Sequence, residues 1–80
     1  MVGGVVVTCD LLDGYALACV RDRVGSNCLY VQLEYRPGGA ASAIRPGDTL
    51  WWQGDYAYWT PEGGTVEDIK IRRLSYSYSL

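Results

Sequence analysis

The side chains in this sequence that could carry out chemistry are three cysteines and a scattered set of carboxylates. Histidine is absent, which removes the commonest general base, the usual partner of a serine or cysteine nucleophile, and the commonest metal ligand. The carboxylates mostly adjoin turns or lie on polar strand faces, so we interpret them as solvated side chains. These residues predict a protein that is not an enzyme.

The cysteines do not form a metal-binding pattern. Nine residues separate Cys9 from Cys19 and eight separate Cys19 from Cys28, and there is no fourth cysteine. This spacing matches no zinc site. We expect reduced thiols that pack as small hydrophobic side chains. No glycine pair has the flanking pattern of a nucleotide loop, so we expect neither a metal nor a cofactor.

The aromatic residues carry more information than the titratable ones. The sequence has three Trp, seven Tyr and no Phe, so every large ring bears a polar group. Such rings are enriched at interfaces, where one end is dry and the other wet. Several of them lie on either side of Gln53-Gly54-Asp55, whose glycine suits a tight turn. We therefore predict a hairpin over Thr49 to Thr60.

Side chains alternate between two faces along such a hairpin. The face predicted to join the core holds Leu50, Trp52, Ala57 and Trp59. The opposite face mixes rings with polar residues, as contact surfaces often do, and holds Thr49, Trp51, Gln53, Tyr56, Tyr58 and Thr60. Three adjacent exposed rings are typical of a partner site. Alternatively, these rings only form cross-strand pairs that stabilise the hairpin.

The last six residues, 75–80, alternate serine with larger side chains. If the segment is extended, Tyr76, Tyr78 and Leu80 lie on one face. We expect an extra edge strand that packs on this protein or on a second copy, with a disordered tail as the alternative. The predicted partner-binding residues are therefore Trp51, Gln53, Tyr56, Tyr58, Tyr76 and Tyr78.

Glycine and proline punctuate stretches rich in Val, Ile, Tyr, Trp and Thr, which is typical of strands and turns. Outside the hairpin, the predicted strands are Val2 to Asp10, Tyr15 to Asp22, Asn27 to Arg36, Ala40 to Ile44 and Val66 to Leu74. Leu29, Val31 and Leu33 alternate with polar residues and should face the core. No apolar repeat at helical spacing is sustained, so helix should be minor or absent.

These elements predict an all-β protein with a single domain over residues 1–80. Its six or seven short antiparallel strands must protect their edges, so we expect a curled sheet or a partly open SH3-like barrel. A domain of 80 residues buries only about 60% of its unfolded surface. Burial in a homo-oligomer would supplement so small a core.

Charge and hydropathy limit the partners. The formal net charge is −2 and the basic residues are scattered, so we do not expect duplex nucleic acid as a partner. No apolar run approaches the ~20 residues that cross a bilayer. The first residues lack the features of a signal peptide. We therefore expect a cytoplasmic protein that is not bound to a membrane.

The segment from Arg45 to Pro61 also carries a resemblance. Its Pro-Gly-Asp, followed by Trp-Trp-Gln-Gly and Tyr-Trp-Thr-Pro, resembles short uncharacterised proteins encoded by bacteriophages and prophages. More loosely, it resembles an SH3-like barrel with Gly-Asp before a Trp-containing strand. The resemblance implies a phage accessory protein in the cytoplasm of a bacterial host. It implies no functional residue beyond the aromatic hairpin.

These observations predict a non-enzymatic protein that docks onto another protein, or onto its own copy, through the aromatic hairpin and the tail. The first alternative is a self-assembling structural subunit of the virion type. A second is capture of a small cation in a cage of rings near Asp48 or Asp55. A third is binding of single-stranded nucleic acid, for which the rings are present but the sequence shows no basic groove.

Overall fold

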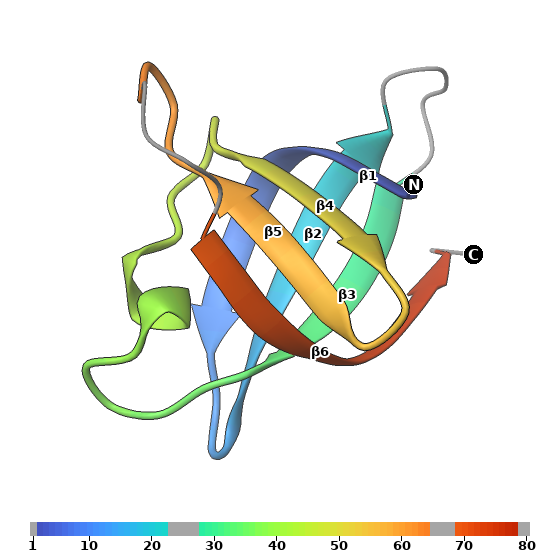
Figure 1. Cartoon of the computed structure of the whole chain (residues 1–80). Coiled ribbons are helices and arrows are strands. Elements are labelled where there is room, and N and C mark those ends of the chain that lie inside the picture. Colours follow the sequence, from blue (N-terminus) through green and yellow to red (C-terminus); the bar gives the residue numbers. More distant parts are fainter. Residues whose placement is uncertain (1, 23–27, 65–68, 79–80) are drawn as a thin grey trace.

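The computed structural model describes residues 2–22, 28–64 and 69–78. Within these ranges six strands form, namely β1 (Val2–Leu11), β2 (Tyr15–Asp22), β3 (Cys28–Glu34), β4 (Thr49–Gln53), β5 (Tyr56–Thr60) and β6 (Ile69–Tyr78). All neighbouring strands are antiparallel, and they close into a barrel in the order β1-β2-β3-β6-β5-β4 (Figure 1). The all-β prediction is confirmed, and closure leaves the ring of these strands without a free edge.

Strand β1 closes the barrel because it pairs with β2 on one side and with β4 on the other. Gly3 and Gly4 lie where both neighbours are close. A Cβ atom added to Gly3 would lie 2.1 Å from the carbonyl oxygen of Leu50, and one added to Gly4 would lie 2.0 Å from that of Arg21. Glycine therefore permits the close approach of the backbones that closure requires.

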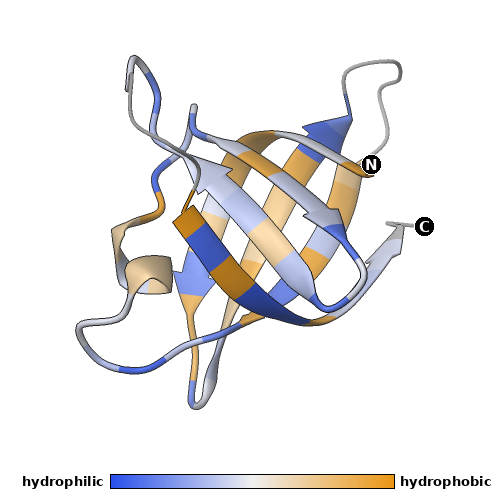
Figure 2. Ribbon diagram, in the orientation of Figure 1, coloured by the Kyte–Doolittle hydropathy of each residue, from blue (hydrophilic) through white to orange (hydrophobic). Residues whose placement is uncertain are grey.

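The core lies inside the barrel and follows the predicted alternation. Leu29, Val31 and Leu33 of β3 are buried, which confirms the inward face of that strand. Figure 2 shows hydrophobic and hydrophilic residues alternating along the strands. The buried cluster comprises Val6, Ala16, Ala18, Val20, Leu29, Val31, Leu33, Ala41, Ile44, Leu50, Trp52, Ala57, Trp59 and Ile71.

The predicted strand Val66 to Leu74 and the tail 75–80 are one strand, β6, as far as the structure describes them. Residues 65–68, 79 and 80 lie outside the described ranges. Strand β6 pairs with β5 through residues 69–72 and with β3 through residues 73–78. A bulge at Leu74 shifts the register, so that Arg73 lies opposite Leu33 and Tyr76 opposite Val31. Because of that extra residue, Tyr76 lies on the side of the sheet that faces the core.

The predicted strand Ala40 to Ile44 is wrong, because a short 3₁₀ helix, η1 (Ala40–Ala43), occupies this place. Both the backbone N–H and the hydroxyl of Ser42 donate hydrogen bonds to the carbonyl oxygen of Gly39. Alanine favours helix, and serine readily bonds to nearby backbone. Ala41 and Ile44 are buried at this end of the barrel. In the described ranges, no helix has the length and apolar character needed to cross a membrane.

Candidate functional site

The hairpin β4–β5 forms in the predicted place. Its two-residue loop is Gly54-Asp55, with Gln53 directly opposite Tyr56. Gly54 has a φ of 63°, which suits the first loop position of a type II′ turn. The side chains predicted to face the core are all buried, namely Leu50, Trp52, Ala57 and Trp59. The predicted division of the hairpin into two faces is therefore confirmed.

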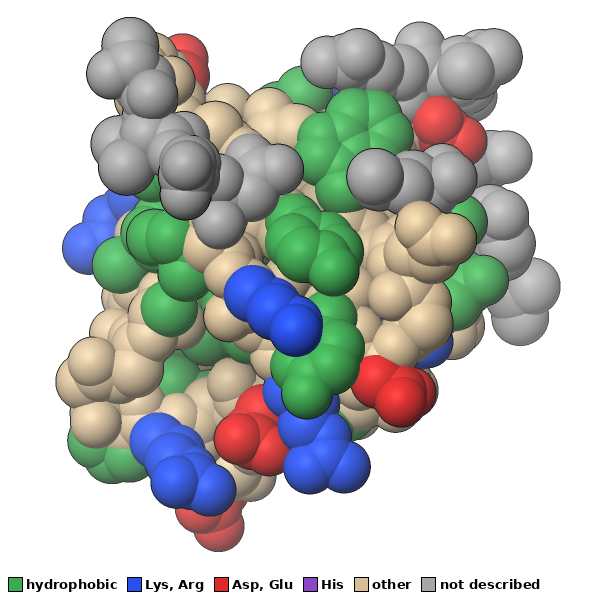
Figure 3. All heavy atoms as spheres, viewed as in Figure 1, with side chains coloured by type: hydrophobic (Ala, Val, Ile, Leu, Met, Phe, Trp, Pro, Cys, Tyr) green, Lys and Arg blue, Asp and Glu red, His purple; other side chains and the backbone are tan. Residues whose placement is uncertain are grey.

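The outward side of the hairpin carries the predicted rings. Trp51 lies directly opposite Tyr58, and both are half-buried. Gln53 and Tyr56 are exposed, with 41% of Tyr56 accessible. We call these four residues the aromatic face. Figure 3 looks onto this side of the barrel and shows a row of hydrophobic side chains, with basic and acidic side chains next to it.

Strand β6 places cations beside the rings. Lys70 lies directly opposite Tyr58, and Arg72 lies directly opposite Tyr56. The Nζ atom of Lys70 is 4.0 Å from the centroid of the Tyr56 ring, which is a cation–π contact. The aromatic face therefore continues into a positively charged surface on β6.

A pocket lies next to these cations, where β3 ends and the chain runs toward η1. Its volume is about 200 Å³, and Lys70 and Arg72 line it together with Glu34 and Arg36. Gly39, Ala40, Ala41 and Ile71 supply the rest of the lining. We call it the basic pocket. The sequence does not predict this pocket, because residues 34–41 and 70–72 meet only through the packing of β3, β6 and η1.

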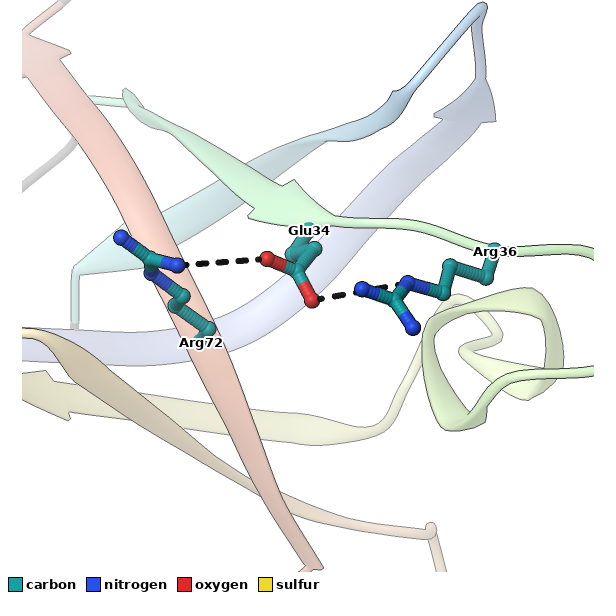
Figure 4. A network of polar contacts seen from close by, with 3 residues as sticks. All are labelled: Glu34, Arg36 and Arg72. Carbon is teal, nitrogen blue, oxygen red and sulfur yellow. Dashed lines mark ion pairs between the residues drawn. The ribbon is translucent and has the colours of Figure 1, made fainter.

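Glu34 is the carboxylate of the basic pocket. Figure 4 shows it between Arg72 of β6 and Arg36, just beyond the end of β3. Its Oε2 atom is 3.6 Å from Nη1 of Arg72, and its Oε1 atom is 3.9 Å from Nε of Arg36. Both distances exceed that of a charge-assisted hydrogen bond, and both arginines are largely exposed. These ion pairs are therefore loose.

Tyr76 does not join the aromatic face. The centroid of its ring lies 5.6 Å from the centroid of the buried Trp52 ring. The guanidinium carbon of Arg73, which is also on β6, lies 4.9 Å from the centroid of the Tyr76 ring. The Arg73 guanidinium donates two hydrogen bonds to the carbonyl oxygen of Gly54, the one from Nε spanning 2.8 Å. Tyr76 is 40% exposed, and it contacts the buried Trp52 and the arginine that holds the hairpin tip. The side chain of Tyr78 lies outside what the structure describes.

Asp48 is a structural carboxylate, and its interpretation as a solvated turn residue is wrong. It is 3% exposed. Its Oδ2 atom accepts hydrogen bonds from the backbone N–H of Arg45 and from Nε1 of Trp59, and its Oδ1 atom accepts one from the backbone N–H of Glu62, each over 2.8 Å. Burial alone would raise the pKa of Asp48, but these donors outweigh it and hold the pKa below its usual range.

The three cysteines are free thiols. Cys19 is buried, and Cys28 lies diagonally across from it on the neighbouring strand. Burial raises the pKa of Cys19, and a hydrogen bond with the Cys28 thiol raises it further. Burial and the nearby Asp10 raise the pKa of Cys9. Cys9 and Cys19 therefore stay protonated at neutral pH, as small packed side chains do.

Comparisons of this chain with protein-family models, with curated protein sequences and with solved structures found no significant match.

Proposed function

We propose that this protein is a non-enzymatic binding module that docks onto another protein through its aromatic face. The observation that carries the proposal is the outward position of Trp51, Tyr56 and Tyr58 on adjacent strands. Their chain neighbours Trp52 and Ala57 already fill the barrel beneath them. The outward rings therefore lie on the other side of the sheet from the core, where they form a mixed aromatic and polar surface that a partner can cover.

The chemistry of these rings suits docking. Burying apolar surface stabilises a complex by roughly 25 cal/mol per Å², and the phenol hydroxyls and the indole N–H orient the partner. The rings stand on a hairpin whose register and tip are already held by the barrel. Little conformational entropy is therefore lost on binding, which favours affinity.

The proposal is tested by selecting displayed random peptides on the wild-type protein and on Trp51→Ala and Tyr58→Ala variants. We expect enrichment on the wild type and a loss of about tenfold or more in affinity for each variant, because truncating a central ring removes the main anchor. Tyr30→Ala is the matched control, since Tyr30 is an exposed tyrosine on β3. Circular dichroism must show that the variants stay folded. Unfolding of Trp51→Ala would assign that ring to the core.

The same face would serve a second copy of this chain, as in a self-assembling structural subunit. Light scattering over a concentration series separates the two cases. A molar mass that rises with concentration for the wild type, and stays constant for Trp51→Ala, would identify the partner as a second copy. A constant mass for both agrees with docking onto a different protein.

The bacteriophage accessory role implied by the Pro-Gly-Asp and Trp-Trp-Gln-Gly segments stays a prediction. The genes that flank the coding sequence would test it, since capsid, lysis or anti-defence genes would agree with it. Housekeeping genes on both sides would count against it.

A further inference from the structure

The basic pocket and the aromatic face are continuous, because Lys70 lines the pocket and contacts Tyr56 of the aromatic face. Its Nζ atom lies over the Tyr56 ring, and its side chain lines the pocket. Arg72, which also lines the pocket, lies directly opposite Tyr56. A partner segment that covers Tyr56 and Tyr58 must therefore pass beside the pocket.

The charge of the pocket is opposite to that of the whole chain. Three cations, Arg36, Lys70 and Arg72, line it together with one carboxylate, Glu34, whereas the formal net charge of the protein is −2. A local excess of positive charge in a concave site attracts an anion. The site is therefore complementary to a negatively charged group.

The arginines retain donors for such a group. Glu34 contacts Arg36 and Arg72 only over 3.9 and 3.6 Å, whereas each guanidinium has five N–H donors. The two arginine side chains are 83% and 63% exposed, so little energy is lost when their contacts to Glu34 rearrange. A second carboxylate could accept the paired hydrogen bonds that arginine makes most readily.

The dimensions of the pocket favour an amino-acid side chain as its occupant. Its volume is about 200 Å³, which is below the ~300–1,000 Å³ of typical small-molecule sites. Ala41 and Ile71 give it an apolar part, which suits the methylene groups of a glutamate. Single-stranded nucleic acid needs a groove that follows several phosphates, whereas this pocket offers its cations at one place.

Building on the proposed function, we infer that the partner segment is acidic. An aspartate or glutamate of the partner places its carboxylate in the basic pocket beside Lys70. There it replaces Glu34 in the loose contacts with Arg36 and Arg72. An apolar side chain of the same segment covers Tyr56 and Tyr58. The rings supply affinity, and the pocket selects an acidic residue at one position.

The test repeats the peptide selection with an Arg36→Gln/Arg72→Gln double variant, which keeps long polar side chains and removes two charges. Arg21→Gln is the matched control, because Arg21 is an exposed cation on β2, away from the pocket. The best wild-type peptide is then synthesised in its acidic form and with glutamine or asparagine at each acidic position. Fluorescence anisotropy gives the affinities, and labelled oligothymidylate is titrated in parallel.

We expect acidic peptides on the wild type, a loss of about tenfold when the acidic residue or the two arginines are replaced, and no change for Arg21→Gln. Selection of neutral apolar peptides that still depend on Trp51 would overturn the acidic partner and leave the proposed function standing. If no peptide is enriched on the wild type, both fail. Tighter binding of oligothymidylate that depends on Arg36 and Arg72 would reassign the pocket to phosphate.

Discussion

The indole Nε1 of Trp59 donates a hydrogen bond to Oδ2 of Asp48 over 2.8 Å, and both side chains are buried. Asp48 also accepts hydrogen bonds from the backbone N–H groups of Arg45 and Glu62. One carboxylate therefore joins the chain before β4 to the chain after β5 and to the core. This arrangement holds both open ends of the hairpin that carries the aromatic face.

Replacing Asp48 should lower the stability of the protein. We expect Asp48→Asn to reduce the free energy of unfolding by about 3 kcal/mol, because a buried amide group replaces an acceptor of three hydrogen bonds. Urea denaturation followed by tryptophan fluorescence measures the change. Asp55→Asn is the matched control, since Asp55 is exposed in the loop of the same hairpin. Equal stability of the two variants would contradict a structural role for Asp48.

Asp48 should also make stability depend on acid pH. Its pKa in the folded state lies below that in the unfolded state, so the unfolded chain binds its proton at higher pH. The stabilisation is therefore complete above the unfolded pKa and is lost as the pH falls through the folded pKa. Urea denaturation at a series of acid pH values should show this loss in the wild type and a smaller loss in Asp48→Asn.

Substitutions of Tyr76 and Tyr56 should have opposite effects, one on the stability of the protein and the other on its affinity for a partner. Tyr76 contacts the buried Trp52, so we expect Tyr76→Ala to lower the free energy of unfolding by about 1–2 kcal/mol and to leave peptide affinity unchanged. Tyr56→Ala should weaken peptide binding and leave stability nearly unchanged, because Tyr56 lies on the aromatic face. Tyr76 is equally exposed but lies on the core side of the sheet. Thermal melts and anisotropy on both variants check this. Weakened peptide binding by a Tyr76→Ala protein of unchanged stability would show that Tyr76 is part of the docking surface.

The buried thiol of Cys19 should react slowly. Its raised pKa means that a smaller fraction is thiolate at neutral pH than for an ordinary cysteine, and the thiolate is the reactive form. Mass spectrometry should show iodoacetamide labelling of Cys19 that is slow near pH 7, faster as the pH rises, and fast in urea. Rapid labelling of Cys19 in the folded protein at pH 7 would contradict the burial.

The turn at Gly54 should tolerate substitution poorly. Because its φ is 63°, we expect Gly54→Ala to cost about 1 kcal/mol in the free energy of unfolding. Asp55→Ala, at the neighbouring loop position, should cost less, since Asp55 has no positive φ. Chemical denaturation of the two variants compares them. A larger loss for Asp55→Ala would show that the turn is not limited by the backbone angle at Gly54.

Local patterns in the sequence predicted the barrel strands and the two faces of the hairpin, but they also predicted a strand at Ala40 to Ile44, where a 3₁₀ helix forms. The predicted strand Tyr15 to Asp22 coincides with β2, and Trp52 and Trp59 are buried as the alternation of the hairpin predicts. Consecutive side chains of a strand point to opposite faces whatever the strand packs against. The alternation of residues along the sequence therefore indicated strands that bury one face.

Only the tertiary structure decided which strands meet and where the alternation shifts. The bulge at Leu74 moved Tyr76 to the core side. The pairing of β4 with β5 brought the indole of Trp59 and the backbone N–H of Glu62 to Asp48. The approach of β6 and η1 gathered Arg36, Lys70 and Arg72 around one pocket. These contacts join residues far apart in the chain. They depend on register and barrel closure, which a pattern of neighbouring residues does not contain.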